Sequence, residues 1–201
     1  MSAGEVVIIP SGGANIASLQ YALLRLGISS AVSANARKIR AASHVILPGV
    51  GAAADAMARL RQKNLDSLLA ALEQPVLGIC LGMQLLFESS EEGQVRCLGV
   101  IPGRAMRFPG YAGLSVPHMG WNGLNVERES GLLEGIRQDD YVYFAHSYAL
   151  NLSAATIASS VYGQSFSACV QWRNFYGVQF HPERSAAVGA RLLRNFLTLG
   201  S

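Results

Sequence analysis

A cysteine between two glycines is the residue of this sequence best suited to act as a nucleophile. Cys80 stands in Gly78-Ile-Cys-Leu-Gly82, between an apolar run and a helical pattern. This spacing is typical of a sharp strand-to-helix turn that leaves no room for side chains beside a strained nucleophile. The helix N-terminus would favour a thiolate, and the N–H of Leu81 could stabilise an oxyanion. A small buried cysteine in a glycine-rich turn is the alternative.

A histidine and a glutamate near the end of the chain could activate this cysteine. His181 and Glu183 lie in Gly177-Val-Gln-Phe-His-Pro-Glu183, after a strand-like run. Residues i and i+2 of an extended segment point the same way, so Glu183 can bind one imidazole nitrogen while the other faces the thiol. His-Pro-Glu alone is typical of a surface turn. Together with the Cys80 motif it predicts a Cys-His-Glu triad.

A second glycine-rich segment could complete an acyl-transfer site. Leu47-Pro-Gly-Val-Gly51 directly follows a strand-like run, and its glycines leave the backbone N–H groups free to turn toward a ligand. We expect Gly49, Val50, Gly51 and Leu81 to supply the oxyanion donors. An ordinary turn between a strand and a helix is the alternative.

The first ninety residues alternate between strand-like and helical patterns. Strands are predicted at residues 5–10, 30–33, 44–47 and 76–79, with a tight turn at 48–51. Helices are predicted at 16–26, 52–63, 65–73 and 83–88. The alternation indicates an α/β fold with a doubly wound, mainly parallel sheet flanked by helices, and a ligand site at the carboxyl ends of the strands.

Glycine, proline and short strand-like runs predominate after residue 90. Strands are predicted at 98–101, 104–108, 124–126, 141–149, 156–162, 166–171 and 176–180. We expect them to extend the sheet, mostly in antiparallel fashion, before a final helix at 188–199. No linker or repeat divides the pattern, so we expect residues 1–201 to form one domain.

The composition limits the classes of partner and location. The chain has 201 residues, of which 50% are hydrophobic and 14% charged, and its net charge is +3. The weak, scattered positive charge argues against nucleic acid, whereas the low charge suggests that another chain covers part of the surface. Three unpaired-looking cysteines and no signal or membrane-spanning pattern predict a reduced cytoplasmic protein that spans no membrane. We expect no cofactor and no metal site.

Taken together, the motifs resemble the class I (triad) glutamine amidotransferases. The resemblance rests on Pro48-Gly-Val-Gly51, Val76-Leu-Gly-Ile-Cys-Leu-Gly-Met-Gln84 and Gln179-Phe-His-Pro-Glu-Arg-Ser185. Pro117-His-Met-Gly-Trp-Asn122 and Tyr143-Phe-Ala-His-Ser-Tyr148 are similar to one branch of that family, the glutaminase subunits of imidazole glycerol phosphate synthases. The resemblance implies a flavodoxin-like fold with an antiparallel extension, and it runs from the first predicted strand to the last predicted helix.

The resemblance also implies a reaction and a substrate site. Cys80 would attack the side-chain amide of L-glutamine, His181 would pass a proton to the leaving ammonia, and Glu183 would orient His181. The resulting glutamyl thioester would be hydrolysed to glutamate. Gln84 and Glu92 would hold the amino-acid end of glutamine, and the segment His146, Ser147 and Tyr148 would line the other side of the pocket. For Glu92, an exposed loop without a ligand is the alternative.

A partner chain follows from the same resemblance. It implies a heterodimer with a TIM-barrel cyclase that receives the ammonia and makes imidazole glycerol phosphate and an aminoimidazole carboxamide ribotide in histidine biosynthesis. We expect the interface at Trp121, Asn122, Tyr143 and Arg184, because aromatic residues in charge-poor stretches suit the centre of an interface. Core packing is the alternative for each aromatic residue.

Two rival functions and one departure from the family pattern remain. Another amidotransferase of the class would share the triad but not the segment around Trp121, and a non-catalytic docking homologue would not require the triad. An α/β-hydrolase would place its acid before its histidine, the reverse of the order here. The departure is in the turn Pro10-Ser-Gly-Gly-Ala-Asn15, where relatives usually carry an acidic residue.

Overall fold

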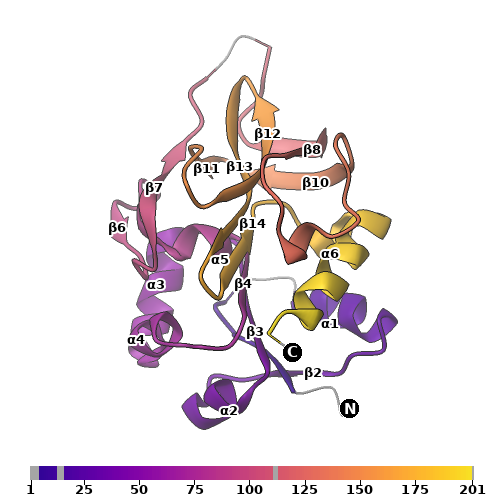
Figure 1. The fold of residues 1–201 in the computed structure, drawn as a ribbon. Coiled ribbons are helices and arrows are strands. Elements are labelled where there is room, and N and C mark those ends of the chain that lie inside the picture. Colours follow the sequence, from indigo (N-terminus) through magenta and orange to yellow (C-terminus); the bar gives the residue numbers. More distant parts are fainter. Residues whose placement is uncertain (1–4, 13–15, 111–112, 201) are drawn as a thin grey trace.

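An eight-stranded sheet forms the centre of the molecule in the computed structural model, which describes residues 5–12, 16–110 and 113–200 (Figure 1). Five strands are parallel neighbours, in the order β2 (Ser30–Val32), β1 (Val6–Ile8), β3 (His44–Gly49), β4 (Val76–Cys80) and β14 (Phe175–Val178). Three antiparallel strands continue it: β13 (Gln164–Trp172), β12 (Thr156–Tyr162) and β9 (Asn125–Val126). The predicted α/β fold with a mainly parallel sheet is confirmed.

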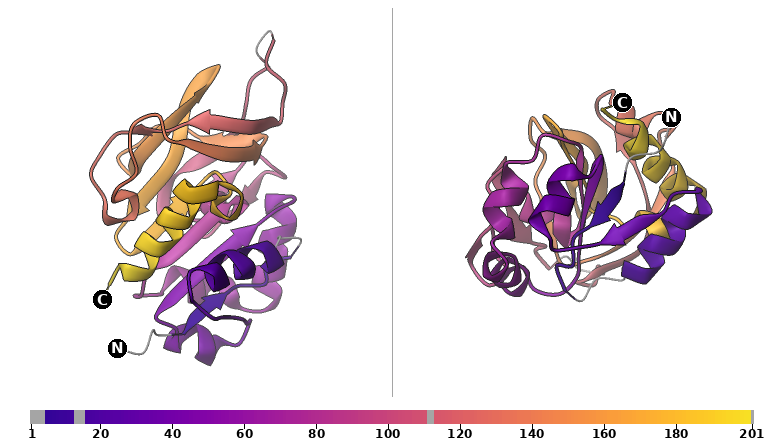
Figure 2. Two further views of the ribbon diagram at one scale, coloured as in Figure 1. Left: turned by 90° about the vertical axis from the view of Figure 1, so that its right-hand side faces the viewer. Right: turned by 90° about the horizontal axis from the view of Figure 1, so that it is seen from below.

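Helices cover both faces of this sheet. One face carries α1 (Ile16–Arg25) and α6 (Ala186–Thr198), which lie toward the viewer in the left part of Figure 2. The other carries α2 (Ala36–Ala41), α3 (Ala53–Gln62), α4 (Leu65–Ala70) and α5 (Leu81–Leu85). Successive residues of β1 therefore enter different hydrophobic clusters, Ile8 on the α1 face and Val7 on the α3 face. Burial on both faces explains the continuous apolar runs of the parallel strands.

Several later strands do not extend the central sheet, which corrects the prediction. One group is a two-stranded sheet of β8 (His118–Gly123) and β10 (Tyr141–His146). The other is a four-stranded sheet in the order β11 (Tyr148–Leu150), β7 (Ile101–Arg107), β5 (Phe87–Ser90) and β6 (Val95–Arg96). The predicted single strand at 141–149 is broken at Ser147, because β10 pairs with β8 whereas β11 pairs with β7. Of the later strands that do extend the central sheet, β14 is parallel to β4, and β13, β12 and β9 are antiparallel.

Two predicted boundaries beside the Cys80 turn are wrong. The helix expected at 83–88 ends at Leu85, and Phe87 begins β5, where it is buried and pairs with Ile101. Tertiary pairing overrides local helix propensity there. Pro48 and Gly49 belong to β3 rather than to a tight turn. Two 3-10 helices complete the described elements, η1 (Gly131–Leu133) and η2 (Pro182–Arg184). Asn15 of the N-terminal turn lies outside the described residues.

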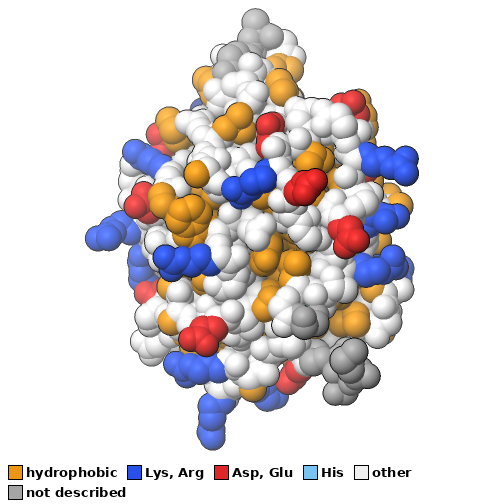
Figure 3. Space-filling model, in the orientation of Figure 1, with side chains coloured by type: hydrophobic (Ala, Val, Ile, Leu, Met, Phe, Trp, Pro, Cys, Tyr) orange, Lys and Arg blue, Asp and Glu red, His pale blue; other side chains and the backbone are white. Residues whose placement is uncertain are grey.

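The face shown in Figure 3 carries little concentrated charge. On the face shown in Figure 3, basic and acidic side chains are interspersed among apolar and uncharged polar ones. No helix in the described part of the chain is long and apolar enough to cross a bilayer.

Candidate active site

The Cys80 turn has the strained geometry that its glycines predicted. Cys80 ends β4 and precedes the first residue of α5 with φ 53° and ψ −114°, a conformation that non-glycine residues rarely adopt. Its side chain is almost completely buried. A Cβ at Gly82 would lie 1.7 Å from the carbonyl oxygen of Leu47, so only glycine lets α5 pack against β3. The sequence here forces the sulfur to the carboxyl end of the sheet.

His181 and Glu183 follow β14, the strand beside β4. The Nδ1 of His181 lies 2.9 Å from Oε1 of Glu183, and both side chains are buried. The backbone N–H of His181 donates to the carbonyl of Tyr143 in β10 at 2.9 Å. Ser185 fixes the same turn, because its hydroxyl donates to the carbonyl of His181 at 2.7 Å. The sequence motif is therefore held in place by contacts with a different sheet.

The electrostatics favour a protonated His181. Burial alone lowers the pKa of His181, but hydrogen bonds to Cys80 and Glu183, together with their charges, outweigh burial and raise the pKa to about 10. Since Nδ1 of His181 is hydrogen-bonded to Glu183, Nε2 is the nitrogen available to exchange a proton with Cys80. Oε2 of Glu183 is buried and has no hydrogen-bond partner among the described residues. The structure thus brings the three residues of the predicted triad together, with His181 bonded to Glu183 and its pKa raised in part by Cys80.

A pocket of about 210 Å³ opens beside Cys80. It is lined by these residues: Val50, Gly51, Cys80, Leu81, Gln84, Glu92, Pro117, Met119, Ala145, His146, Ser147 and Tyr148. All five residues predicted to bind substrate are among them. Gly49 lies instead on a small adjoining cavity that His181 and Glu183 also line.

The predicted oxyanion segment lies across from Cys80. Gly49 is the register partner of Cys80 in the parallel pair of β3 and β4, so Val50 and Gly51 leave the sheet at the mouth of the pocket. Ser11, which is fully buried, donates its hydroxyl to the carbonyl of Pro48 and ties down the end of β3. Gly51 has φ 87°, a value that favours glycine, and open space surrounds its Cα.

A row of amides that sequence reasoning missed lies behind the sulfur. Gln84 Nε2 donates to the carbonyl of Tyr148 at 2.9 Å and to Oε1 of Gln179 at 3.0 Å. Gln179 Nε2 in turn lies 3.7 Å from the sulfur of Cys80. Gln179 stood in the motif Gln179-Phe-His-Pro-Glu-Arg-Ser185 and in a predicted strand, but neither signal assigned its side chain a role at the sulfur.

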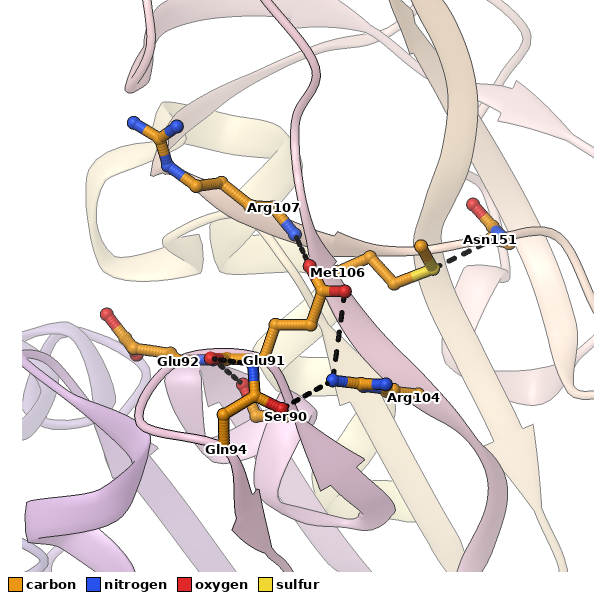
Figure 4. A network of polar contacts seen from close by, with 8 residues as sticks. All are labelled: Ser90, Glu91, Glu92, Gln94, Arg104, Met106, Arg107 and Asn151. Carbon is orange, nitrogen blue, oxygen red and sulfur yellow. Dashed lines mark hydrogen bonds and ion pairs between the residues drawn. The ribbon is translucent and has the colours of Figure 1, made fainter.

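Glu92 and Glu91 point in different directions. Oε2 of Glu92 accepts from the N–H of Ala53 at 2.9 Å, which caps the N-terminus of α3 where Ala52 offers no side-chain cap. Burial raises the pKa of Glu92; the Ala53 hydrogen bond opposes this change, and the charge of Asp55 adds to it. In Figure 4, the Glu91 carboxylate instead accepts from the N–H of Arg107 at 2.9 Å, away from the Glu92 carboxylate. Glu92 therefore lines the pocket and also caps the N-terminus of α3.

Two buried histidines, His146 in the pocket wall and His118 behind it, are hydrogen-bonded to each other. His146 binds the carbonyl of Tyr148 through Nδ1 at 2.9 Å and Nδ1 of His118 through Nε2 at 3.1 Å. Burial is the main cause that lowers the pKa of His146 to about 3, with the charges of His118 and His181 adding to it and the Tyr148 hydrogen bond opposing it. Burial lowers the pKa of His118 to about 4, and this ring stacks on Tyr162 at 4.0 Å. Both histidines are neutral at physiological pH.

Two of the residues predicted to form an interface, Trp121 and Tyr143, are register partners in β8 and β10, and Arg184 of η2 lies against Tyr143. Trp121 is 51% exposed and contacts Tyr143 edge-on, with ring centroids 6.0 Å apart. The guanidinium carbon of Arg184 lies 4.4 Å from the centre of the Tyr143 ring, a cation–π arrangement. Asn122 is engaged within the chain, because its Nδ2 donates to the carbonyl of Val161 at 2.8 Å. Trp121, Tyr143 and Arg184 form what we term the aromatic face.

Comparison with known families and sequences gives one consistent result. The family model described as "Glutamine amidotransferase class-I" matches residues 7–199. The "Imidazole glycerol phosphate synthase subunit HisH" of Xanthomonas euvesicatoria pv. vesicatoria is 52% identical over 97% of this chain and 98% of its own length. "Imidazole glycerol phosphate synthase subunit HisH 2" of Legionella pneumophila (strain Lens) is 50% identical over 98% of both chains.

Solved structures share the fold at much lower identity. A putative GMP synthase subunit from Thermoplasma acidophilum superposes with a TM-score of 0.75 at 18% identity, covering 98% of this chain and 94% of that one. A structure described as a glutamine amidotransferase gives a TM-score of 0.73 at 20% identity, covering 96% of each chain. At these identities the likeness concerns the fold alone.

Proposed function

Because the chain belongs to the class I glutamine amidotransferase family, we propose that it is the glutaminase subunit of an imidazole glycerol phosphate synthase. It hydrolyses L-glutamine to glutamate and ammonia in histidine biosynthesis. Relatives about 50% identical over nearly the whole chain support this assignment. The observation that carries it is Cys80 in a strained turn at the end of β4, with His181 just after the neighbouring strand β14 and its Nδ1 2.9 Å from Oε1 of Glu183.

The proposed reaction begins at the sulfur of Cys80. The thiolate attacks the side-chain amide carbon of glutamine, and the negative charge that develops on the amide oxygen is stabilised by backbone N–H groups of Leu81 and of residues 49–51. Protonated His181 then gives its Nε2 proton to the amide nitrogen, and the C–N bond breaks to release ammonia. The product of this half-reaction is a glutamyl thioester on Cys80.

Hydrolysis of the thioester completes the cycle. Neutral His181 takes a proton from a water molecule, the hydroxide attacks the thioester carbon, and the C–S bond breaks to return the thiolate and glutamate. Glu183 keeps His181 in one tautomer and stabilises its charged form through both half-reactions. The raised pKa of His181, about 10, supports its role as the proton donor to ammonia.

The pocket suits the zwitterionic end of glutamine. Glu92 offers a carboxylate for the ammonium group, with one oxygen held by Ala53. Gln84 donates its N–H groups to Tyr148 and Gln179, so its Oε1 is the atom available to accept a hydrogen bond from substrate. His146, Ser147 and Tyr148 form the opposite wall.

We propose that ammonia passes to a TIM-barrel cyclase bound at the aromatic face in a heterodimer. This face adjoins the pocket, since β8 supplies both Trp121 to the face and Met119 to the pocket. The cyclase then makes imidazole glycerol phosphate and the aminoimidazole carboxamide ribotide. We propose that all 201 residues act as one domain, supported by the family match over residues 7–199, and that the protein works in the cytoplasm.

Replacing the nucleophile tests this function. The wild type and Cys80→Ala are each mixed with a cyclase of the pathway and supplied with glutamine or with an ammonium salt. We expect Cys80→Ala to lose glutamine-dependent synthesis by about 10³-fold or more while ammonium-dependent synthesis is unchanged. Cys169→Ala, a buried thiol away from the pocket, is the matched control. Glutamine use by Cys80→Ala would show that the assignment of the nucleophile is wrong.

A further inference from the structure

Gln179 touches the sulfur of Cys80 without belonging to the triad. It is fully buried, and it lies immediately after β14, two residues before His181. Its backbone N–H donates to the carbonyl of Ala168 in β13 at 2.8 Å, which fixes where the side chain starts. The side-chain Nε2 lies 3.7 Å from the sulfur, within hydrogen-bond range for sulfur.

The hydrogen-bond network fixes which end of the Gln179 amide faces the sulfur. The carbonyl of Tyr148 can only accept, so the atom of Gln84 that lies 2.9 Å away must be its NH₂ group. The same NH₂ group lies 3.0 Å from Gln179, and it can donate only to an oxygen there. The NH₂ group of Gln179 therefore points at Cys80, and a flipped amide would break the row.

The sulfur thus has different partners for its two protonation states. As a thiol it can donate to the carbonyl of Ala145, 3.9 Å away. As a thiolate it can accept from Gln179 and from His181. Hydrogen bonds to a charged acceptor are about twice as strong as neutral ones, and low-dielectric surroundings strengthen them further. The Gln179 N–H therefore stabilises the thiolate more than the thiol.

We propose that Gln179 is a further catalytic residue, whose amide N–H holds negative charge on the Cys80 sulfur while Tyr148 and Gln84 set its direction. The proposal rests on the proposed glutaminase function and deepens it. Protonated His181 offsets the negative charge of the sulfur, but it later transfers its proton to the leaving ammonia. Gln179 has no proton to give, so its hydrogen bond to the sulfur is the same when the thiolate attacks glutamine and when the C–S bond of the thioester breaks and the thiolate leaves.

Alkylation of the sulfur measures this effect directly. The rate at which iodoacetamide modifies Cys80 is followed against pH in the full chain, with Cys80→Ala giving the background from other thiols. In Gln179→Met, which keeps the bulk and removes the donor, we expect the pH midpoint of alkylation to rise by about one unit. We expect kcat for glutamine in the presence of the cyclase to fall about tenfold.

Several controls separate this role from a structural one. The titratable groups around the sulfur are His181 with Glu183 behind it, and Glu92 and His146 across the pocket; all remain in the variant. Gln171→Met removes a half-buried amide of β13 away from the sulfur, and its alkylation midpoint should match the wild type. If Gln179→Met does not fold, Gln179→Glu, which preserves the shape of the side chain, replaces it as the test variant. It too should raise the pH midpoint of alkylation.

The outcomes distinguish the two proposals. A folded Gln179→Met with an unchanged midpoint and kcat within twofold of wild type overturns the role of Gln179. If Gln179→Met does not fold, an unchanged midpoint in Gln179→Glu overturns it equally. A wild type that releases no glutamate from glutamine, with or without the cyclase, overturns the proposed function instead, whatever the alkylation profiles show.

Discussion

The two sides of the pocket are held in different ways. On what we term the amide side, Gln84, Gln179, His146 and the carbonyl of Tyr148 are joined in one buried hydrogen-bonded row. On what we term the loop side, Val50 is half-buried and Gly51 is exposed, and the end of β3 is tied by the Ser11 hydroxyl to Pro48. Buried, mutually satisfied polar groups have few alternative arrangements, whereas an exposed glycine has many.

This difference assigns separate tasks to the two sides. The proposed nucleophile ends β4 and the proposed proton donor follows β14, and these two strands of the central sheet are paired. The proposed oxyanion donors of residues 49–51 lie on the side that includes the exposed Gly51, where we expect a change of conformation. A partner that binds near the pocket can therefore regulate turnover through the loop side without disturbing the thiolate.

The largest expected effect contrasts two glycines, one beneath each side. Gly82→Ala places a methyl group 1.7 Å from the carbonyl oxygen of Leu47, and we expect the free energy of unfolding to fall by about 3 kcal/mol or more. Gly51→Ala meets nothing within 4 Å, and its positive φ costs about 1 kcal/mol. Urea unfolding measures both. Equal losses would mean that the loop side is packed as tightly as the Cys80 turn.

The next effect concerns regulation by the partner. We expect the free chain to be a poor glutaminase because the backbone N–H groups of residues 49–51 do not yet point at the oxyanion. Binding of the cyclase should raise the rate of glutamate release about tenfold or more, which corresponds to a barrier lower by about 1.4 kcal/mol. Glutamate release is measured with and without the cyclase. Equal turnover in the two conditions would refute this prediction.

Substitutions on the surface show where this regulation enters. Trp121→Ala removes an exposed side chain of the aromatic face and should weaken the stimulation by the cyclase. Leu152→Ala removes an exposed apolar side chain that is not part of this face and should leave the stimulation unchanged.

The smallest expected effect is the pH dependence of stability that arises from His146 of the amide side and its partner His118. His118 and His146 have pKa values lowered to about 4 and 3, so the unfolded chain binds more protons than the folded one as the pH falls below 6.5. The free energy of unfolding should therefore fall with pH below 6.5, each histidine adding a slope of up to about 1.4 kcal/mol per unit. His118→Phe keeps a ring against Tyr162 and should reduce this slope. Urea titrations between pH 4.5 and 6.5 check it, and an unchanged slope would contradict it.

Local patterns predicted the elements whose neighbours in sequence are also their neighbours in space. The first four strands and the helices α1, α3 and α4 were predicted near their observed positions because each apolar period reports burial of its own element, whereas the short helix α2 was not among the predicted helices. The helix expected over 83–88 failed where Phe87 pairs with Ile101, a contact made with a later strand. β8 was not predicted at all, since its glycines and Asn122 are poor strand formers that only pairing with β10 makes extended.

The candidate site shows the same division. The three segments that lie together at the pocket were identified by residue type and spacing, because a strand-to-helix turn demands glycines and a His-x-Glu pair can align in an extended segment. Glu92 was placed at the pocket by resemblance, but the bond that holds it, to Ala53 of α3, had no sequence signal. Asn122 was expected at an interface, and the structure commits its amide to Val161.

The sequence by itself determined the chemistry available to this protein: a cysteine in a turn that only glycines permit, and a histidine with its carboxylate at the end of a strand. These are short-range consequences of backbone sterics, so they can be read from spacing. Only the tertiary structure decided that β14 lies beside β4, which brings His181 to Cys80. It also decided that Gln84 meets Gln179 across 95 residues of chain. Such contacts depend on how separate sheets pack, and no local period encodes them.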